Sequence, residues 1–186
     1  RGYEQATMAR IARRAGASKE TLYAWFGDKT GLASALIETS AFQTVGIPNP
    51  DTVDGQYTHD AARQALSTYS HELLVLITGR HSIALNRAAM SSPALAKVFR
   101  QRANSRNWPI VRSYLSRLHE VGVVNAPNSS DALGLLFGLL AKDLQVQTLL
   151  GVDPPSPEAC QQRAVRAVDD FLRLTTTATR LRRSNL

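Results

Sequence analysis

The sequence predicts an all-α protein in which three short N-terminal helices precede a longer helical body. Two observations favour this fold class. Apolar residues recur at intervals of three and four over most of the 186 residues, which is the spacing of one face of an α-helix. No run of alternating apolar and polar residues stands out, so signals for β-strands are scarce.

The first two helices are predicted from their caps and from the turn between them. Thr7 is placed to cap a short helix. The apolar face of that helix carries four residues at helical spacing: Met8, Ile11, Ala12 and Ala15. Gly16 can adopt the left-handed conformation that ends a helix, and Ser18 can cap the next one. Two short helices joined by a tight turn form a helix-turn-helix.

The second helix has an apolar side and a polar side. Leu22 and Phe26 are four residues apart and are expected to face inward, with Trp25 beside them. The polar side carries Lys19, Glu20, Thr21, Tyr23 and Ala24. A short helix of this kind can enter the major groove of DNA and read base edges. An ordinary helical hairpin with a solvated polar face is the alternative interpretation.

Two further residues of this region can hold phosphate. The hydroxyl of Tyr23 can donate to a phosphate oxygen. Lys29 begins a third helix, predicted over 29–43, where the helix dipole and the ammonium group both favour an anion.

The middle of the chain is predicted to be a linker followed by further helices. Residues 45–56 contain prolines and glycines without an apolar period, which is typical of a linker. Helical spacing resumes over 57–77. Ser92-Pro93 is a strong helix start, and that helix should run toward Glu120. Asn107-Trp108-Pro109 predicts a kink or a split in it.

The last two helices predict a homodimer. Residues 131–150 are apolar nearly all round, so this helix must be buried on more than one side. Gly134 and Gly138 are four residues apart and would let another helix approach closely. A final helix is predicted over 158–175. The predicted interface comprises Leu133, Phe137, Leu140, Leu144, Val168 and Phe171. The alternative is that both helices form the core of a monomer.

Polar and aromatic groups on the apolar helices of the body are candidates for a small-molecule site. The predicted set is Asn86, Arg87, Trp108, Tyr114, Asp143 and Gln147. Each of these residues could instead be a structural residue whose hydrogen bonds are satisfied within the fold. Nothing in the sequence identifies the ligand.

The composition limits the kinds of partner and the cellular compartment that we expect for this protein. The net charge of +7 and the pI of about 10.1 favour a polyanionic partner, although a basic surface can also serve solubility. Cys160 is the only cysteine, so no intrachain disulfide can form. The sequence shows neither a signal peptide nor an apolar run long enough to span a bilayer, and we expect a cytoplasmic protein.

The sequence gives little support for an enzyme. His71-Glu72 lacks the second histidine of a zinc-hydrolase motif, and no cysteine pair favours a metal. The sequence contains no nucleophile elbow, phosphate loop or dinucleotide fingerprint. We therefore predict no catalytic residue, no metal and no cofactor.

Beyond these physical arguments, the segment "TMARIARRAGASKETLYAWFGDKTGL" closely resembles the DNA-binding segment of the TetR family of transcriptional repressors. The shared features are Thr7, Ile11-Ala12, Ala15-Gly16, Ser18, Thr21-Leu22-Tyr23, Phe26, Lys29 and Leu32. The resemblance covers about residues 1–42. A weaker one, to the AefR-like group of C-terminal domains, covers about residues 67–174.

The resemblance implies roles for residues of the segment. It implies that Thr7, Tyr23 and Lys29 hold the DNA backbone. It places Ser18, Lys19, Glu20 and Thr21 nearest the bases. The family often has glycine where this chain has Glu20, whose carboxylate can accept from a cytosine amino group or can repel phosphate. Arg1-Gly2-Tyr3 resembles the end of the family's first helix, and the rest of that helix is not in this sequence. In the family the missing part of the helix would cover Met8, Ile11 and Leu22.

The resulting hypothesis is an all-α regulator with a helix-turn-helix DNA-binding domain over 1–44, a linker over 45–56 and a ligand-binding and dimerisation domain over 57–186. It would be a homodimeric repressor that binds a palindromic double-stranded DNA operator and is released by a small-molecule effector. One alternative is a family member controlled by a protein partner or by no ligand. An alternative of another class is a helical enzyme or carrier without DNA binding.

Overall fold

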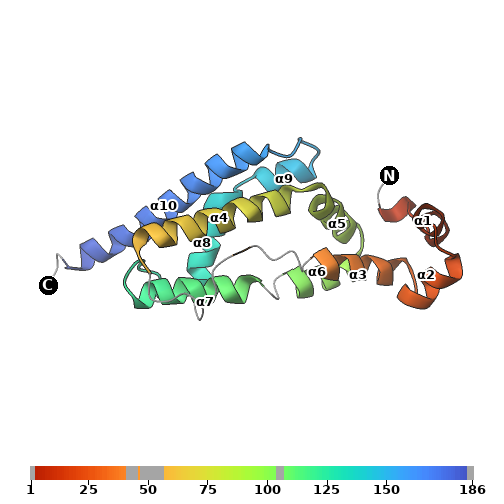
Figure 1. Cartoon of the computed structure of the whole chain (residues 1–186), viewed down its shortest axis with the longest axis horizontal. Helices are drawn as coiled ribbons and strands as arrows, with labels where there is room; N and C mark the ends of the chain where they lie inside the picture. The colour runs from red at the N-terminus through yellow and green to blue at the C-terminus, as the bar shows by residue number, and fades with distance from the viewer. Residues whose placement is uncertain (1–2, 41–45, 47–56, 104–106, 184–186) are drawn as a thin grey trace. The chain divides into compact units, whose positions relative to one another are not determined.

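A computed structural model of the chain describes residues 3–40, 46, 57–103 and 107–183. Within these residues the regular structure consists of helices, without a strand, so the predicted all-α class is confirmed (Figure 1). In the same part of the chain no helix has both the length and the hydropathy required to cross a membrane. The predicted linker over 45–56 lies outside the described residues, except for Gly46.

The contacts divide the chain into two compact units. The first comprises 1–44 and 80–106, and the second comprises 45–79 and 107–186. The contacts group residues 80–106 with the N-terminal helices, whereas the sequence predicted that they belong to the body. The predicted domain boundaries stay a prediction.

In its described residues the first unit contains a short 3₁₀ turn and five helices. They are η1 (Tyr3–Gln5), α1 (Met8–Ala15), α2 (Lys19–Phe26), α3 (Lys29–Ser40), α5 (Arg80–Ser91) and α6 (Pro93–Ala103). One small core joins α1 and α2 through Met8, Ala12 and Leu22. Another joins α3 to α5 and α6 through side chains that include Ile37, Ala89 and Leu95. Helix α3 thus acquires a core by packing on helices that come much later in the chain, whereas α1 and α2 form their small core with each other.

The predicted start and break of the helix after Ser92 are confirmed. The hydroxyl of Ser92 accepts from the backbone N–H of Leu95 at 3.5 Å, and Pro93 occupies the first position of α6. Helix α6 ends at Ala103 and the next helix begins at Asn107. The predicted single helix is therefore two helices, one in each unit.

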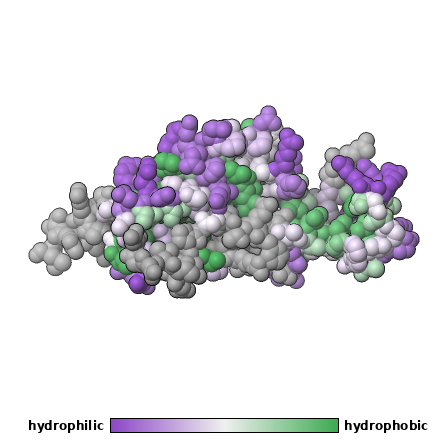
Figure 2. Space-filling view, in the orientation of Figure 1, coloured by the Kyte–Doolittle hydropathy of each residue, from purple (hydrophilic) through white to green (hydrophobic). Residues whose placement is uncertain are grey.

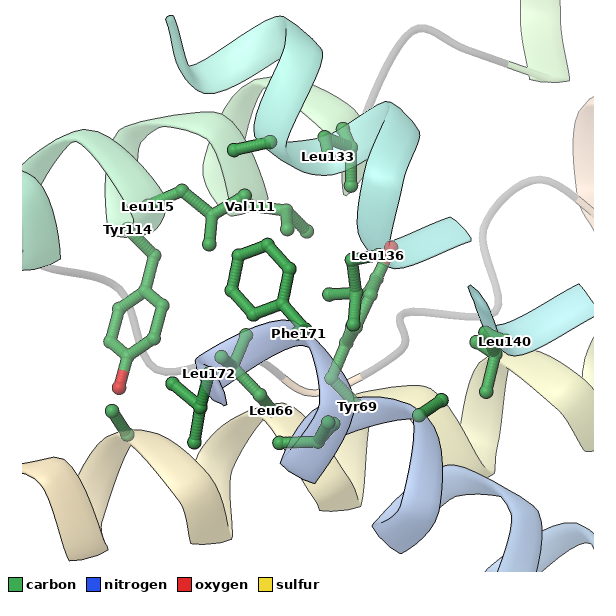
Figure 3. Close-up of a cluster of buried hydrophobic side chains, with 14 of the residues drawn as sticks. Leu66, Tyr69, Val111, Tyr114, Leu115, Leu133, Leu136, Leu140, Phe171 and Leu172 are labelled. Atoms are coloured by element: carbon green, nitrogen blue, oxygen red, sulfur yellow. The ribbon is translucent and has the colours of Figure 1, made fainter. Parts of the chain in front are cut away.

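The part of the second unit that the structure describes contains five helices. They are α4 (His59–Thr78), α7 (Asn107–Glu120), α8 (Ser129–Ala141), α9 (Leu144–Leu149) and α10 (Pro157–Arg183). Helix α10 lies along α4 and also contacts α8, while α8 packs on α7 (Figure 1). The core between them is drawn in Figure 3, where leucine, tyrosine and phenylalanine side chains of α4, α7, α8 and α10 point toward one another. A bidentate pair between Arg63 and Asp169 also joins α4 to α10.

The helix predicted over 131–150 is broken, which corrects that prediction. Helix α8 ends at Ala141, and Lys142 has a φ of 42°, a region that favours glycine. Arg163 of α10 donates to the carbonyl oxygens of Leu140 and Ala141 at 2.6 and 3.3 Å. These carbonyls would otherwise lack partners at the end of the helix. An arginine that is distant in the sequence therefore stabilises the break.

Candidate DNA-binding surface

The turn between α1 and α2 has the predicted caps. The Thr7 hydroxyl accepts from the backbone N–H of Arg10 at 3.4 Å. Gly16 has a φ of 65°, and its N–H donates to the carbonyl of Ala12. The Ser18 hydroxyl accepts from the N–H of Thr21 at 3.0 Å. These local bonds fix where α2 begins and therefore which of its residues lie in its first turn.

One side of α2 packs on α1 and α3. Leu22 is 5% exposed and Phe26 is half-buried, as predicted from their spacing. Trp25 is 71% exposed, so the prediction that it lies inward beside them is wrong. The small core of α1 and α2 is filled by Met8, Ala12 and Leu22. The ring of Trp25 makes an edge-to-face contact with Phe26, at 6.2 Å between centroids.

The opposite side of α2 is exposed and carries charged, aromatic and small residues. Lys19, Glu20 and Ala24 are exposed, and Tyr23 is 44% exposed. The ammonium of Lys19 lies 5.7 Å from the centroid of the Tyr23 ring. A hydrogen bond with its own backbone N–H, followed by one with the Ser18 hydroxyl, lowers the pKa of the Glu20 carboxyl. This side therefore presents a carboxylate that is ionised at neutral pH.

Two of the residues predicted to lie nearest the bases are used in the cap of α2. Thr21 is half-buried, and its hydroxyl lies 2.9 Å from that of Ser18. These two hydroxyls satisfy each other and the first turn of the helix. The other two residues of the predicted set, Lys19 and Glu20, are exposed to solvent. Their charged groups have no comparable role in the cap, apart from the bond between Glu20 and the Ser18 hydroxyl.

Lys29 begins α3, as predicted, but its ammonium already has partners. Its Nζ donates to the carbonyl oxygens of Tyr3 and Glu4 at 3.1 and 3.3 Å. It also lies 4.3 Å from the centroid of the Tyr3 ring. Lys29 therefore ties η1 to the start of α3. An ammonium has three N–H donors, and the third is available for an anion such as phosphate.

A cluster of exposed arginines on α1 was not among the predicted site residues. Arg10, Arg13 and Arg14 are all exposed, and Arg10 donates to the carbonyl of Gln5 at 3.2 Å. The surface over α1 is correspondingly hydrophilic in Figure 2. The "RIARR" charge pattern in the sequence was the signal that could have identified them. They add positive charge next to α2, which favours a polyanion.

The six residues predicted to line a ligand site are divided between the two units. Asn86 and Arg87 belong to the first unit, and the amide of Asn86 donates to the carbonyl of Ser82 in its own helix at 2.8 Å. Trp108 packs against Phe137, with 6.1 Å between ring centroids.

The other three predicted ligand residues also have local partners. Tyr114 is buried in the core, with its ring 6.2 Å from that of Tyr57. Asp143 and Gln147 are exposed and bond to each other at 2.5 Å, although a largely buried helix was expected there. Asp143 precedes α9 and Gln147 lies on its exposed side, while Thr148 of the same helix is buried.

Most of the predicted dimer interface lies inside the subunit. Leu133, Leu140, Val168 and Phe171 are at most 2% exposed within the single chain, so they have no surface to offer a partner. Phe137 and Leu144 are half-buried against the same core. The residues predicted for the interface lie on the sides of α8 and α10 that face the core of the subunit. The exposed side of α8 instead carries Gly134, Leu135 and Gly138.

A groove of about 700 Å³ lies along α7 and the start of α8 in the second unit. Its lining is mainly polar, with Arg112, Arg117 and several serines. Arg117 is paired with Glu120 at 2.9 Å. Among the residues that the structure describes, no group of three or more His, Cys, Asp or Glu side chains is arranged to hold a metal ion. Burial raises the pKa of the Cys160 thiol, which makes it a poor nucleophile.

Comparisons with known proteins bear on both units. Residues 1–36 match the family model described as bacterial regulatory proteins, tetR family. Residues 64–174 match the model described as the AefR-like transcriptional repressor, C-terminal domain. A comparison with curated protein sequences found no match.

Solved structures with the same fold are also transcriptional regulators. A TetR transcriptional regulator from Agrobacterium tumefaciens is 29% identical, with a TM-score of 0.72 over 90% of this chain and 82% of that one. The flavonoid-responsive regulator FrrA is 24% identical, with a TM-score of 0.66 over 94% and 88% of the two chains. The regulator PfmR from Thermus thermophilus is 20% identical, with a TM-score of 0.58 over 92% and 90%.

The second family model spans well over half of the chain, and the first spans the helix-turn-helix described above. Members of this family are transcriptional regulators and not enzymes, so the enzyme alternative is set aside. The chain belongs to the TetR family of transcriptional regulators.

Proposed function

We propose that the chain is a homodimeric transcriptional repressor that binds a two-fold symmetric DNA operator through α2 and is released by a small-molecule effector. This proposal rests on the exposed side of α2. A capped helix of eight residues buries Leu22 and leaves Lys19, Glu20 and Tyr23 exposed beside a basic α1. Such a helix fits the major groove, with flanking donors for phosphate. A repressor of this kind acts at the chromosome, so we place it in the cytoplasm.

The glycines of α8 support a dimer formed by a second copy of this chain. Gly134 and Gly138 are exposed and one turn apart, and a Cβ added to either meets no described atom within 4 Å. Neither has a positive φ. Glycine inside a helix costs about 1 kcal/mol relative to alanine, and nothing described within the subunit requires it here. Close approach of a partner helix over Gly134, Leu135 and Gly138 would account for the presence of both glycines.

The buried serines of α4 support an effector site in the second unit. Ser67 and Ser70 are 7% and 0% exposed, and among the described residues their hydroxyl oxygens have no hydrogen-bond partner. A buried hydroxyl without a partner is uncommon and often marks a bound water or ligand. They are one turn apart on one helix. We propose that the effector reaches these two hydroxyls and binds the DNA-incompetent state more tightly.

In vitro selection from random double-stranded DNA, followed by a mobility shift with the selected sequence, tests DNA binding. We expect a sequence with two-fold symmetry and binding that weakens steeply as salt rises. A protein that selects no sequence, and binds selected and scrambled DNA alike, would contradict the proposal.

A double substitution, Gly134→Ala with Gly138→Ala, tests the dimer surface. Alanine should favour the helix and raise the free energy of unfolding of the subunit by about 1–2 kcal/mol in total. The same two methyl groups should weaken self-association in sedimentation. Association that is unchanged would show that a partner does not approach these glycines.

A thermal-shift screen of small organic molecules, including flavonoids because FrrA is described as flavonoid-responsive, tests the effector. A hit should stabilise the protein and also lower its affinity for the operator. Ser67→Ala and Ser70→Ala should each remove that response while leaving operator binding intact. Without a hit, or with a response that survives both substitutions, control by a protein partner or by no ligand becomes the better hypothesis.

A further inference from the structure

Glu20 lies on the exposed side of α2. With 3.6 residues per turn, residues 20 and 24 lie on the same face, roughly opposite the buried Leu22. Glu20 and Ala24 are both exposed, whereas Leu22 is 5% exposed. Glu20 is also the second residue of the helix. The first turn of a recognition helix is the part that contacts base edges.

The neighbours of Glu20 leave space for its carboxylate to reach a base. Ala24, one turn further along, has only a methyl group, so the helix can approach the floor of the groove. Tyr23 flanks this face and is 44% exposed. Its O–H group is a donor suited to a phosphate oxygen beside the groove.

The chemistry of a carboxylate then limits what it can face. Ionised Glu accepts hydrogen bonds and cannot donate. In the major groove the donors are the N4 amino group of cytosine and the N6 amino group of adenine. Guanine presents two acceptors at its edge, and thymine presents an acceptor and a methyl group. Glu pairs with cytosine N4, whereas the paired donor and acceptor of Gln or Asn suit adenine.

We infer that Glu20 is a specificity-determining residue that selects a cytosine in each half of the operator, by accepting a hydrogen bond from its N4 amino group. The inference rests on the proposed function, since it assigns a base to the surface proposed to bind DNA.

Selection from random DNA with three versions of the full-length chain tests the inference. The wild type should select a cytosine at one position of each half-site by about tenfold over other bases, the discrimination of a good base contact. Glu20→Gln should exchange that preference for adenine. Glu20→Ala should remove it at that position and leave the other positions unchanged. Glu4→Gln, at an exposed carboxylate outside α2, makes the same change of charge and should leave every base preference unchanged.

The possible outcomes separate this inference from the proposed function. A wild type that selects no sequence would overturn both. A defined operator whose base preferences survive Glu20→Gln and Glu20→Ala would overturn the inference alone. In that case both variants should bind all DNA more tightly, because Glu20 would only repel phosphate. A shift of preference that is confined to one position and matches the substituted side chain would establish the assignment.

Discussion

Helices α2 and α8 carry the two exposed surfaces on which partner binding is proposed, and they differ in how they are built. Helix α2 has eight residues, of which only Leu22 is buried, and its exposed side carries charge, hydroxyl and aromatic groups. Helix α8 has thirteen residues, five of them buried, and its exposed side carries glycines and Leu135. A polyanion is bound by donors and charges, whereas another helix is bound by close contact and apolar area.

The difference shows how each surface is held in place. The position of α2 depends on local bonds, namely the Gly16 turn and the Ser18 cap. The position of α8 depends on distant residues, because its inner side packs on α4, α7 and α10, and Arg163 of α10 caps its end. Substitutions that separate local from distant support should therefore affect the two helices differently.

The largest effect is expected for Leu140→Glu. Leu140 is fully buried in the core of the second unit (Figure 3), so the substitution buries an unpaired carboxylate and should cost several kcal/mol of stability. Circular dichroism should show loss of the folded state. Leu135→Glu is the matched control on the exposed side of the same helix; it should leave the subunit folded and abolish the dimer. A folded, monomeric Leu140→Glu protein would mean that Leu140 is an interface residue after all.

Gly31→Ala should damage the helix-turn-helix unit. A Cβ at this position would lie 1.9 Å from the carbonyl oxygen of Phe26, a backbone atom that cannot move without shifting the end of α2. We expect a loss of about 1–3 kcal/mol, measured by thermal unfolding, together with weaker operator binding. In Gly16→Ala the φ of 65° is strained but no described atom lies within 4 Å, so about 1–2 kcal/mol should be lost. If Gly31→Ala costs nothing, the junction of α2 and α3 is not crowded.

Lys29→Ala should weaken binding to all DNA alike. If the third N–H of its ammonium contacts phosphate, the slope of log affinity against log salt should fall by about 0.9. The melting temperature should also fall, because the bonds to the carbonyls of Tyr3 and Glu4 are lost. Tyr3→Leu removes the ring contact and the hydrogen bond between the Tyr3 hydroxyl and Thr30 but keeps Lys29, so it should lower the melting temperature without changing the salt slope. A Lys29→Ala protein with altered base preference and an unchanged slope would refute the phosphate role.

The smallest effect is expected for Lys142→Gly. Its φ of 42° is strained for a residue with a side chain, and glycine relieves that strain at the expense of a more flexible unfolded chain. We expect a net gain of about 0.5–1 kcal/mol in the free energy of unfolding, measured by urea denaturation. Arg163→Ala should act in the opposite direction, because the carbonyls at the end of α8 lose their donors. A loss of stability in Lys142→Gly would show that the break is not strained.

The sequence alone determined the helical class, the turn at Gly16, the caps at Thr7 and Ser18, and the break near Asn107. Each of these depends on hydrogen bonds or conformational preferences of residues within a few positions, so the local sequence contains the physical cause. The family resemblance of the N-terminal segment, confirmed by the match over residues 1–36, rests on the same local residues.

Only the tertiary structure decided which sides of the helices are buried. Helix α8 is apolar nearly all round, so its periodicity could not distinguish Leu140 in the core from Leu135 on the surface. The end of α8 at Lys142 depends on Arg163, which is distant in the sequence, and the partners of Lys29 lie on η1. Trp25 is exposed because neighbouring side chains already fill the small core. These features depend on contacts between distant residues, which no local pattern specifies.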